Sequence, residues 1–398
     1  MKNRPTIREQ FFACLGQTSP SPLGIEIQKA EGVFLLSPEG KRYIDLISGV
    51  SVSNVGHARE EVVRAVREQA GNYLHLMVYG EIIQTPQVLL ASLLTEQLPA
   101  SLNSVYFVNS GSEANEAALK LSKRITGRRK IVCFKDSYHG STHGALSVMG
   151  NESFRRSFRP LLPGVTAIRF NSREDLEHID HNTACVIAEP IQAEAGVRLP
   201  VADYLQLLRK RCNDTGTLLI FDEVQTGFGR IGSLFAMQKY GVIPDMVTLA
   251  KALGGGMPLG ALVCDRELMA AWKSDPVLGH ITTFGGHPVC CAAGLAALQV
   301  LLREGWTDKV PDKSSFLKGF LEKHPAVREV RGEGLLLAVE LGSALKVQRI
   351  IRLLLEEGAI ADWFLFCDTA FRIAPPLCIN DQELDLTVRI VTKALDRL

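Results

Sequence analysis

The middle of the chain alternates short apolar runs with longer amphipathic stretches. Each run has four or five consecutive apolar or β-prone residues, and the runs are SVYFVNS (104–110), KIVCFKD (130–136), ACVIAEP (184–190), TLLIFDE (217–223), DMVTLAK (245–251) and LGALVCD (259–265). Runs of this kind are typical of strands covered on both faces, as in a mostly parallel sheet flanked by helices. Two intervening stretches, 113–127 and 203–216, have helical periodicity and end in glycine, a common helix cap. The pattern predicts an α/β domain over about 50–285.

The last third of the chain has a different pattern. Residues 328–341 predict one or two strands around a glycine turn, and 371–377 predict a short strand that ends at Pro-Pro. Residues 344–358 and 381–398 have the periodicity of amphipathic helices. Together these elements predict a smaller α+β domain.

The N-terminal residues complete the division into domains. Residues 24–46 carry hairpin signals around the turn Pro-Glu-Gly-Lys, and we expect this hairpin to pack on the small domain. A chain of 398 residues is too long for one simple core. We therefore expect an N-terminal segment at 1–48, a large domain at 49–290 and a small domain at 291–398.

Composition and charge exclude several classes of protein. The formal net charge is +1, so no electrostatic attraction to nucleic acid or membrane is expected. No run of about 18 apolar residues occurs, and the start, MKNRPTIREQFFACLG, lacks a signal-peptide pattern. The nine cysteines have no CxxC spacing, and several lie inside apolar runs, which favours free thiols in a reducing cytoplasm.

Polar residues of distinct types follow four of the predicted strands. They are Asn109 to Ser112, Glu189, Asp222 with Glu223, and Lys251. In parallel α/β sheets ligands bind at the carboxyl ends of the strands, so these side chains are expected to meet at one site.

The turn Asn-Ser-Gly-Ser-Glu at 109–113 leads from a strand directly into a helix. Small residues let backbone N–H groups approach an anion, and the helix N-terminus favours negative charge, so a phosphate site is one interpretation. The other is a helix start with a capping box between Ser110 and Glu113. The turn alone leaves both open.

Lys251 and Asp222 follow buried strands and could carry chemistry. A lysine at the end of a buried strand is partly desolvated, which lowers its pKa and makes the neutral amine available as a nucleophile. Asp222 could keep a pyridinium nitrogen protonated and make the ring an electron sink. The alternatives are a surface lysine and a Walker B aspartate. The latter requires a GxxxxGK[ST] loop, which the chain lacks.

Tyr138 and Arg372 are weaker candidates when taken alone. An aromatic residue in the turn after a strand could stack on a cofactor ring, or lie at the surface. An arginine is the natural bidentate partner of a substrate carboxylate, although a surface salt bridge is the ordinary alternative.

Two histidine pairs do not indicate a metal site. His139 and His143 are separated by glycine and serine, and His178 and His181 lie in a polar, loop-like stretch. Neither pair has the helical setting of a metal-binding motif, and we predict no metal site.

Taken together, the motifs resemble the class III, or omega-type, aminotransferases. The resemblance extends from SGVSVSNVGH to FRIAPPL and rests on segments in family order: VNSGSEANEAALKL, SYHGST, AEPIQAEAGV, FDEVQTGFGR, TLAKALGGGMPLGA and TTFGGHP. It implies pyridoxal 5'-phosphate as cofactor and a homodimer. It also implies the aspartate-aminotransferase-like fold (fold type I), with a mostly parallel seven-stranded sheet in the large domain and a smaller α+β domain.

The resemblance also implies roles for residues around the cofactor. Lys251 matches the lysine that forms the Schiff base and moves the proton between Cα and C4′. Asp222 would pair with the pyridine nitrogen and Gln225 would contact the 3-hydroxyl. Gly111 and Ser112 would bind the phosphate.

Further roles follow at the edge of the cofactor. Tyr138 would stack on the ring, with His139 beside it, and Glu189 is similar to a site glutamate near the cofactor. Thr283 would reach the phosphate in the neighbouring subunit, so the site would need the dimer.

Two residues would set the choice of substrate. Arg372 resembles the arginine that holds the α-carboxylate of glutamate or 2-oxoglutarate. Glu194 resembles the glutamate that neutralises this arginine when an ω-amine is bound, because an unpaired buried guanidinium is costly. Glu194 would move aside when a carboxylate arrives.

Two positions depart from the family pattern. Members that act on 4-aminobutyrate or acetylornithine usually read YHGRT, and here the arginine position is Ser141. A different donor or a different carboxylate clamp is therefore expected. The family's GGNP reads GGHP, which places His287 close to Thr283.

We predict a cytoplasmic, homodimeric transaminase of amino-acid metabolism. It would move an amino group from an ω-amino acid, a diamine or an N-acetylornithine-type donor to 2-oxoglutarate by a ping-pong mechanism, giving an aldehyde or oxo product and glutamate. The alternative is another chemistry of the same cofactor, an aminomutase or a decarboxylase, against which Arg372 and Glu194 argue. A binding protein that has lost catalysis is a second alternative, and Lys251 and Asp222 argue against it.

Overall fold

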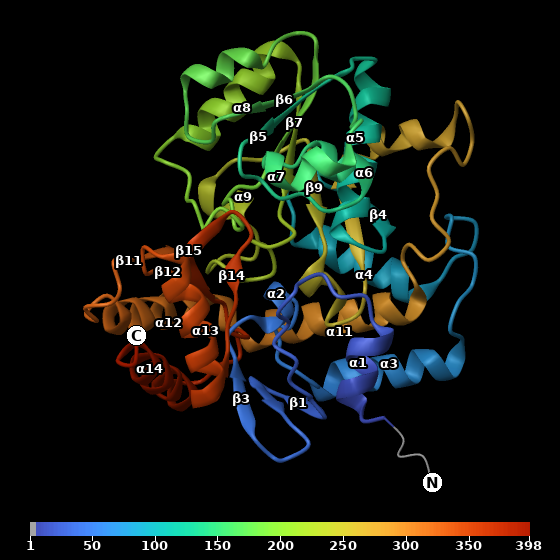
Figure 1. The fold of residues 1–398 in the computed structure, drawn as a ribbon. Coiled ribbons are helices and arrows are strands. Elements are labelled where there is room, and N and C mark those ends of the chain that lie inside the picture. Colours follow the sequence, from blue (N-terminus) through green and yellow to red (C-terminus); the bar gives the residue numbers. More distant parts are fainter. Residues whose placement is uncertain (1–4) are drawn as a thin grey trace.

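The computed structural model describes residues 5–398, and residues 1–4, the start of the predicted N-terminal segment, lie outside that range. Its largest sheet has seven strands in the order β4-β10-β9-β8-β7-β5-β6 (Figure 1). Their bounds are β4 Ser104–Val108, β5 Lys130–Phe134, β6 Val165–Ile168, β7 Thr183–Ala188, β8 Leu218–Asp222, β9 Met246–Leu249 and β10 Gly260–Cys264. Only β10 runs antiparallel to its neighbours, β4 and β9. This is the mostly parallel α/β sheet that the sequence predicts.

Successive strand residues pack on opposite faces of this sheet. Ile131 and Cys133 belong to a cluster with the buried side of α5 (Gly111–Thr126). Val132 and Phe134 belong to a second cluster that includes α4 (Thr85–Glu96), α8 (Tyr204–Thr215) and α11 (Pro288–Glu304). Every residue of β7, β9 and β10 is buried. Unbroken apolar runs therefore form these strands because both of their faces are covered.

Two four-stranded sheets occupy the other end of the molecule. One has the order β11-β12-β15-β14 and the other β1-β2-β3-β13. Their bounds are β1 Lys29–Glu31, β2 Phe34–Leu36, β3 Arg42–Asp45, β11 Glu329–Glu333, β12 Leu336–Glu340, β13 Ala359–Ile360, β14 Trp363–Phe364 and β15 Cys367–Ile373. β3 pairs in parallel with β13, so the N-terminal hairpin and the C-terminal part of the chain share a sheet (Figure 1).

Helices complete this part of the molecule and connect it to the large sheet. α12 (Trp306–Leu321), α13 (Ala344–Glu357) and α14 (Asp381–Leu395) pack around the smaller sheets. α11 packs on α3 (Glu60–Asn72) and α4, and the boundary placed at residue 290 falls inside it. The division into three parts stays a prediction. The short helices are α1 Ile7–Cys14, α2 Ser48–Ser51, α6 His143–Ser147, α7 Glu152–Arg155, α9 Ala236–Tyr240, α10 Arg266–Met269, η1 Arg156–Phe158, η2 Glu174–His178, η3 Lys251–Gly254 and η4 Ala270–Lys273.

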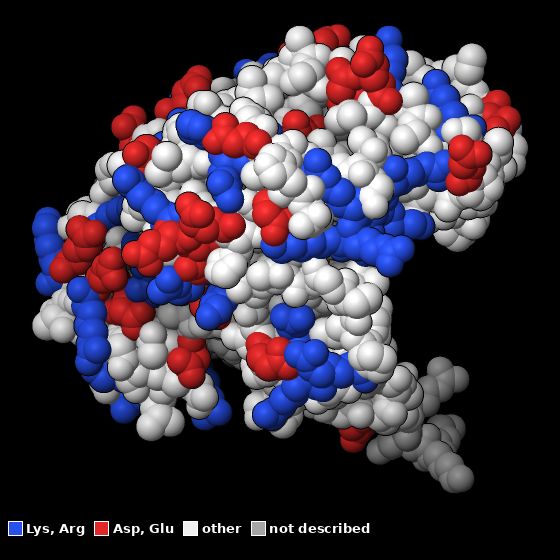
Figure 2. Space-filling view, turned by 90° about the horizontal axis from the view of Figure 1, so that it is seen from above, with Lys and Arg blue, Asp and Glu red and all other residues white. Residues whose placement is uncertain are grey.

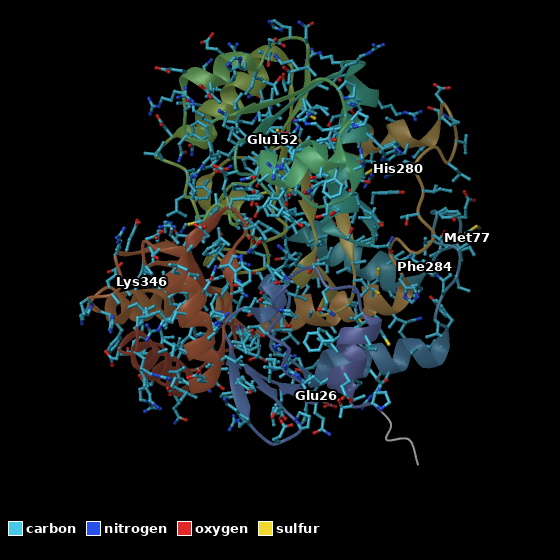
Figure 3. The ribbon with its side chains drawn as sticks, viewed as in Figure 1. Glu26, Met77, Glu152, His280, Phe284 and Lys346 are labelled. Atoms are coloured by element: carbon cyan, nitrogen blue, oxygen red, sulfur yellow. The ribbon has the colours of Figure 1, made fainter. Side chains whose placement is uncertain are left out.

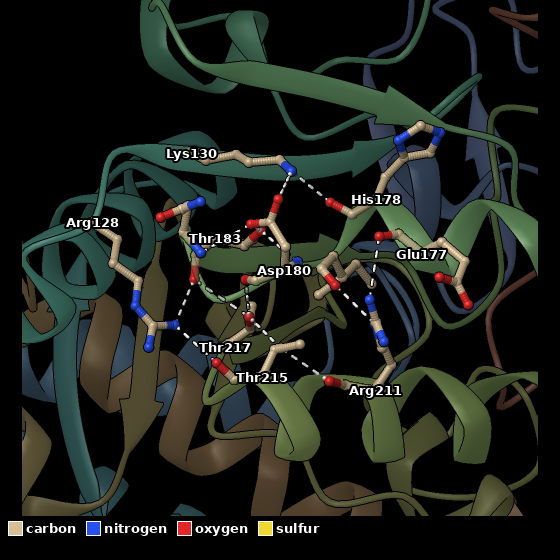
Figure 4. Close-up of polar contacts among 11 residues, drawn as sticks. Arg128, Lys130, Glu177, His178, Asp180, Thr183, Arg211, Thr215 and Thr217 are labelled. Carbon is tan, nitrogen blue, oxygen red and sulfur yellow. Dashed lines mark hydrogen bonds and ion pairs between the residues drawn. The ribbon is translucent and has the colours of Figure 1, made fainter.

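Side chains from neighbouring segments join the amino ends of three central strands (Figure 4). The Arg128 guanidinium donates hydrogen bonds to the backbone carbonyls of Thr183, Thr215 and Gly216 at 2.8 to 3.2 Å. Lys130 Nζ donates to the Asp180 carboxylate at 2.8 Å. These contacts pair backbone carbonyls and side chains at the amino ends of the strands.

The surface carries both signs of charge. Figure 2 shows Lys and Arg side chains interspersed with Asp and Glu over the face seen from above, in keeping with the formal net charge of +1. Within residues 5–398, no single helix is long and apolar enough to cross a membrane, while α11 and α12 together, bent by 69°, pass on length and composition.

Candidate active site

A cavity of about 470 Å³ opens at the carboxyl edge of the large sheet. β4, β8 and β9 end at it, together with the turns that follow β5 and β7. Eight of the eleven predicted site residues line it: Gly111, Ser112, Tyr138, His139, Glu189, Asp222, Gln225 and Lys251. The four polar strand ends therefore meet at one place, as the sequence predicts.

The amino end of α5 forms one end of the cavity. Ser110 is the N-cap and accepts a hydrogen bond from Glu113 N at 3.2 Å, while the Glu113 carboxylate accepts from Asn109 N at 2.9 Å. The capping interpretation and an anion site are thus compatible, because Gly111 and Ser112 still face the cavity. A Cβ on Gly140 would lie 2.0 Å from Ser112 Oγ, so only glycine lets this loop approach the helix. A helix N-terminus among small residues suits a phosphate.

Asp222 ends β8 and has a fixed set of donors. Its Oδ2 accepts from His139 Nδ1 and from Asn115 Nδ2, both at 2.8 Å, and its Oδ1 accepts from Val224 N at 3.1 Å. Asn115 Oδ1 in turn accepts from Thr248 Oγ1 at 2.7 Å. These contacts fix the orientation of the Asp222 carboxylate, which lines the cavity.

Asn115 and Thr248 were not identified from the sequence. Both are buried, Asn115 on the apolar side of α5 and Thr248 inside β9. A polar residue on an otherwise apolar, buried face could have identified them, because such a side chain needs a hydrogen-bond partner.

Lys251 lies directly after β9, at the start of η3. Its Nζ donates to Gln225 Oε1 at 2.8 Å. Burial lowers the pKa of this amine, which increases the fraction of its neutral, nucleophilic form. The backbone of Lys251 has φ +51°, a conformation that side chains with a Cβ seldom adopt. The surrounding structure therefore holds this lysine in an unfavourable local geometry at the site.

Glu189 ends β7 and holds the Tyr138 loop. Its carboxylate accepts from the backbone N–H groups of Tyr138 at 2.8 Å and Ala193 at 3.1 Å. Burial raises the pKa of Glu189 to about 8, and the nearby Asp222 charge adds to the increase. Glu189 therefore contacts backbone groups, and its bond to Tyr138 N holds that tyrosine beside the cavity.

Arg372 and Glu194 lie beside the cavity and not in its wall. Arg372 Nη2 and Glu194 Oε1 are 2.7 Å apart, and these side chains are 1 % and 7 % exposed. The Phe364 ring lies 4.7 Å from the guanidinium. Arg372 is therefore not a surface residue. A second acid, Asp362, lies 3.6 Å from Arg372 Nε, and it was not identified from the sequence. An acid within the mostly apolar segment AIADWFLF was the signal.

Thr283 and His287 lie outside the cavity wall in this chain. Thr283 is exposed, next to Thr282, whose hydroxyl accepts from Asn109 Nδ2 at 2.9 Å. His287 stacks on His75 with ring centroids 5.6 Å apart, and burial lowers its pKa. His287 thus contacts a side chain of the same chain, His75.

The cavity fits pyridoxal phosphate, the cofactor that the resemblance implies. A helix N-terminus, a fixed carboxylate and a buried amine match the phosphate, the ring nitrogen and the aldehyde of that molecule. His139 Nε2 and Gln225 Nε2 are buried and have no hydrogen-bond partner among the described residues. In residues 5–398, no group of three or more His, Cys, Asp and Glu side chains could hold a metal ion.

Comparisons with known proteins relate the whole chain to one family. Residues 16–395 match the family described as aminotransferase class-III. Acetylornithine aminotransferase of Methanopyrus kandleri is 39 % identical over 375 residues, covering 93 % of this chain and 94 % of that protein. That of Archaeoglobus fulgidus is 38 % identical over 368 residues, covering 92 % and 94 %.

Two solved structures have the same fold. An ornithine aminotransferase from Toxoplasma gondii, with partial occupancy of PLP at its active site, aligns with a TM-score of 0.91 at 29 % identity over 98 % of this chain and 94 % of that one. An (S)-enantioselective omega-transaminase from Thermomicrobium roseum aligns with a TM-score of 0.91 at 30 % identity over 98 % of both chains.

Proposed function

Because the chain belongs to the class III aminotransferases, which are pyridoxal-phosphate enzymes, we propose that it transfers an amino group from an ω-amino acid, a diamine or an N-acetylornithine-type donor to 2-oxoglutarate. The predicted family, fold class, enzyme class and cofactor are confirmed. The donor, the acceptor and the role of each residue are our proposal.

The convergence of Lys251 and Asp222 on one cavity is the observation that carries the proposal. Bound pyridoxal phosphate supplies an electron sink for the carbon that bears the amino group. Lys251 Nζ, whose pKa is lowered by burial, would act as the nucleophile toward the cofactor aldehyde and would carry the proton on and off that carbon. Asp222 would keep the ring nitrogen protonated, and Gln225 would hydrogen-bond to the 3-hydroxyl.

Other residues of the site would position the cofactor. Gly111 and Ser112 at the amino end of α5 would hold the phosphate, and Tyr138 would cover the ring. His139 would fix Asp222 through its 2.8 Å contact, and Glu189 would fix the Tyr138 loop.

The acceptor follows from the pair Arg372 and Glu194. A buried guanidinium that already has an acidic partner can exchange that partner for a substrate carboxylate. Glu194 would neutralise Arg372 while an amine donor is bound and move away when glutamate or 2-oxoglutarate enters. This pair favours transamination over an aminomutase or a decarboxylase.

The donor side of the site has aromatic rings and no guanidinium at position 141. Ser141 Oγ lies 3.3 Å from the Tyr138 hydroxyl. Phe366 has its ring centroid 6.4 Å from that of Tyr138 and 5.2 Å from that of Phe154. Donors that differ in the carboxylate far from the reacting amine should therefore be compared in the half-reaction.

Single half-reactions test the proposed function. Cofactor-loaded protein is mixed separately with glutamate, ornithine, N-acetylornithine, 4-aminobutyrate and lysine, and the visible absorbance of the bound cofactor is followed. We expect glutamate and at least one ω-amine to bleach the band. A stable band with every donor would contradict transamination, and product formation without any 2-oxo acid would indicate an aminomutase or a decarboxylase.

We also propose a homodimer in which Thr283 reaches the cofactor phosphate of the partner subunit. Two neighbouring loops expose apolar side chains on one side of the molecule, where Figure 3 labels Met77, His280 and Phe284. The exposed apolar residues of these loops are Leu74, Leu76, Met77, Ile82, Ile83, Val277, Leu278, Ile281 and Phe284. Exposed apolar groups gathered on one face are typical of a protein interface. Thr283 lies in the same loop and outside its own cavity.

Mixing two inactive variants tests this shared site. Lys251→Ala and Thr283→Ala chains are unfolded together, refolded and compared with each variant refolded alone. A mixed dimer contains one site with an intact Lys251 and an intact Thr283 from the partner, so we expect activity to reappear. No recovery, in mixtures that light scattering shows to be dimers, would place Thr283 outside the partner's site.

A further inference from the structure

Arg372 lies between two carboxylates, and only one of them makes a hydrogen bond. Glu194 Oε1 accepts from Arg372 Nη2 at 2.7 Å, while Asp362 Oδ1 lies 3.6 Å from Nε, too far for a hydrogen bond. The Nε and Nη1 atoms of Arg372 are buried and have no hydrogen-bond partner among the described residues. The guanidinium therefore has free donors although two negative charges lie close to it.

Glu194 is held from a second direction. Leu365 N donates to its other oxygen at 3.0 Å, and Phe366 N donates to its backbone carbonyl at 3.0 Å. Leu365 follows β14, and Asp362 precedes it, so one short segment carries both the anchor of Glu194 and the second acid. Glu194 can leave Arg372 only by losing the Leu365 contact as well.

The backbone of Asp362, which directly precedes β14, is hydrogen-bonded to Arg372 in β15 and does not depend on Glu194. Its carbonyl accepts from Arg372 N at 2.8 Å. Its side chain is 27 % exposed, while the oxygen nearest Arg372 is buried. A substrate carboxylate bound to Arg372 would thus lie close to the Asp362 carboxylate, and like charges at such a distance repel.

We propose, on the basis of the function proposed above, that Asp362 sets specificity at Arg372 by weakening the binding of a substrate carboxylate while Asp362 is ionised. Glutamate and 2-oxo acids then bind with uptake of a proton, whereas an amine donor, which leaves Arg372 paired with Glu194, binds without it. Asp362 is a positioning residue in this scheme, because it acts through Arg372.

The surroundings of Asp362 are consistent with this coupling. Burial raises its pKa to about 6, and the charges of Glu194 and Asp45 raise it while Arg372 lowers it. Asp45 is itself paired with His57 at 2.7 Å, and Arg230 lies near both Asp45 and Arg372. Asp362 is therefore mostly ionised at neutral pH and neutral in mild acid. Repulsion is present above about pH 6 and is lost as the pH falls through that value.

The experiment measures the glutamate concentration that half-saturates its half-reaction, from pH 6 to pH 9, in the wild type and in Asp362→Asn. A coupling of about one pKa unit corresponds to about a tenfold change in affinity. We expect Asp362→Asn to bind glutamate about 3- to 10-fold more tightly than the wild type at pH 8, and within about twofold of it at pH 6. Ionisations of glutamate itself affect both proteins alike, so the ratio reports Asp362.

Controls separate a local charge effect from a structural one. Asp368→Asn changes an exposed acid in β15 and should leave the glutamate profile unchanged. The amine half-reaction should change less than about twofold in Asp362→Asn. Proton uptake on adding glutarate, an unreactive dicarboxylate, to weakly buffered enzyme at pH 7.5 should fall in that variant.

Two results would overturn the inference: parallel pH profiles for the wild type and Asp362→Asn, or weaker glutamate binding by the variant at pH 8. If the variant loses stability, Asp362→Ala gives a second measurement of the same ratio. Failure of the wild type to react with glutamate at all would instead contradict the proposed function.

Discussion

Lys251→Ala is expected to lower the rate of both half-reactions by at least about 10²–10⁴-fold, the range for loss of a general acid–base group. The side chain is buried, its Nζ contacts Gln225 at 2.8 Å, and it lies at the end of β9 beside Asp222. No other lysine or arginine lines the cavity in the described residues. Its loss would remove both the proposed nucleophile and the proposed proton carrier. Single-turnover absorbance measurements follow the rate.

The cofactor should still bind to Lys251→Ala, because the phosphate and ring contacts that we propose come from other residues. Borohydride reduction followed by mass spectrometry should attach the cofactor to the wild-type peptide that contains Lys251 and not to the variant. Lys346→Ala, at an exposed position on α13 that Figure 3 labels, is the matched control and should keep wild-type rates. A Lys251→Ala rate within tenfold of the wild type would exclude Lys251 as the catalytic lysine.

Asp222→Asn is expected to reduce activity by about 10²–10³-fold, because removing one partner of a buried ion pair costs about 3–5 kcal/mol. The neutral amide cannot compensate a protonated ring nitrogen. Its NH₂ group would also face the donors of His139 and Asn115, which now lie 2.8 Å from Oδ2. We therefore expect weaker cofactor binding as well as slower proton transfer, measured by dialysis and by single-turnover rates.

A second aspartate provides the matched comparison for Asp222. Asp245 lies just before β9, at the opposite edge of the sheet, where its carboxylate accepts from Leu219 N and Arg209 at 2.7 Å. Asp245→Asn should lower thermal stability and leave the spectrum of the bound cofactor unchanged. Equal effects of the two substitutions on the cofactor spectrum would mean that Asp222 acts on the fold and not on the ring.

The sequence predicted the central sheet well because its strands are buried on both faces. Six apolar runs mark strands β4, β5, β7, β8, β9 and β10. The seventh strand, β6, was expected only from the family resemblance, since its four residues at the sheet edge are mostly half-buried and carry no unbroken apolar run. An edge strand contacts fewer neighbours, so its composition is less constrained.

The site was predictable where one principle gathers residues from several strands. The carboxyl-edge rule brought Lys251, Asp222 and Glu189 together without any family information. Asp362 stands out as an acid in an apolar segment, but its role could not be predicted, because it depends on Arg372 and on Glu194, which is 168 residues away in the chain. Local patterns report burial and turn geometry, whereas a charge cluster of this kind appears only in the folded chain.

The pairing of β3 with β13 has a consequence for synthesis on the ribosome. Ile44 and Ala359 are neighbours in one sheet, yet more than 300 residues separate them in the chain. At a translation rate of about 5–20 residues per second, the N-terminal hairpin waits roughly 15–60 s for its partner strand. During that interval its unpaired edge is open to other chains, which makes the nascent protein a client for chaperones.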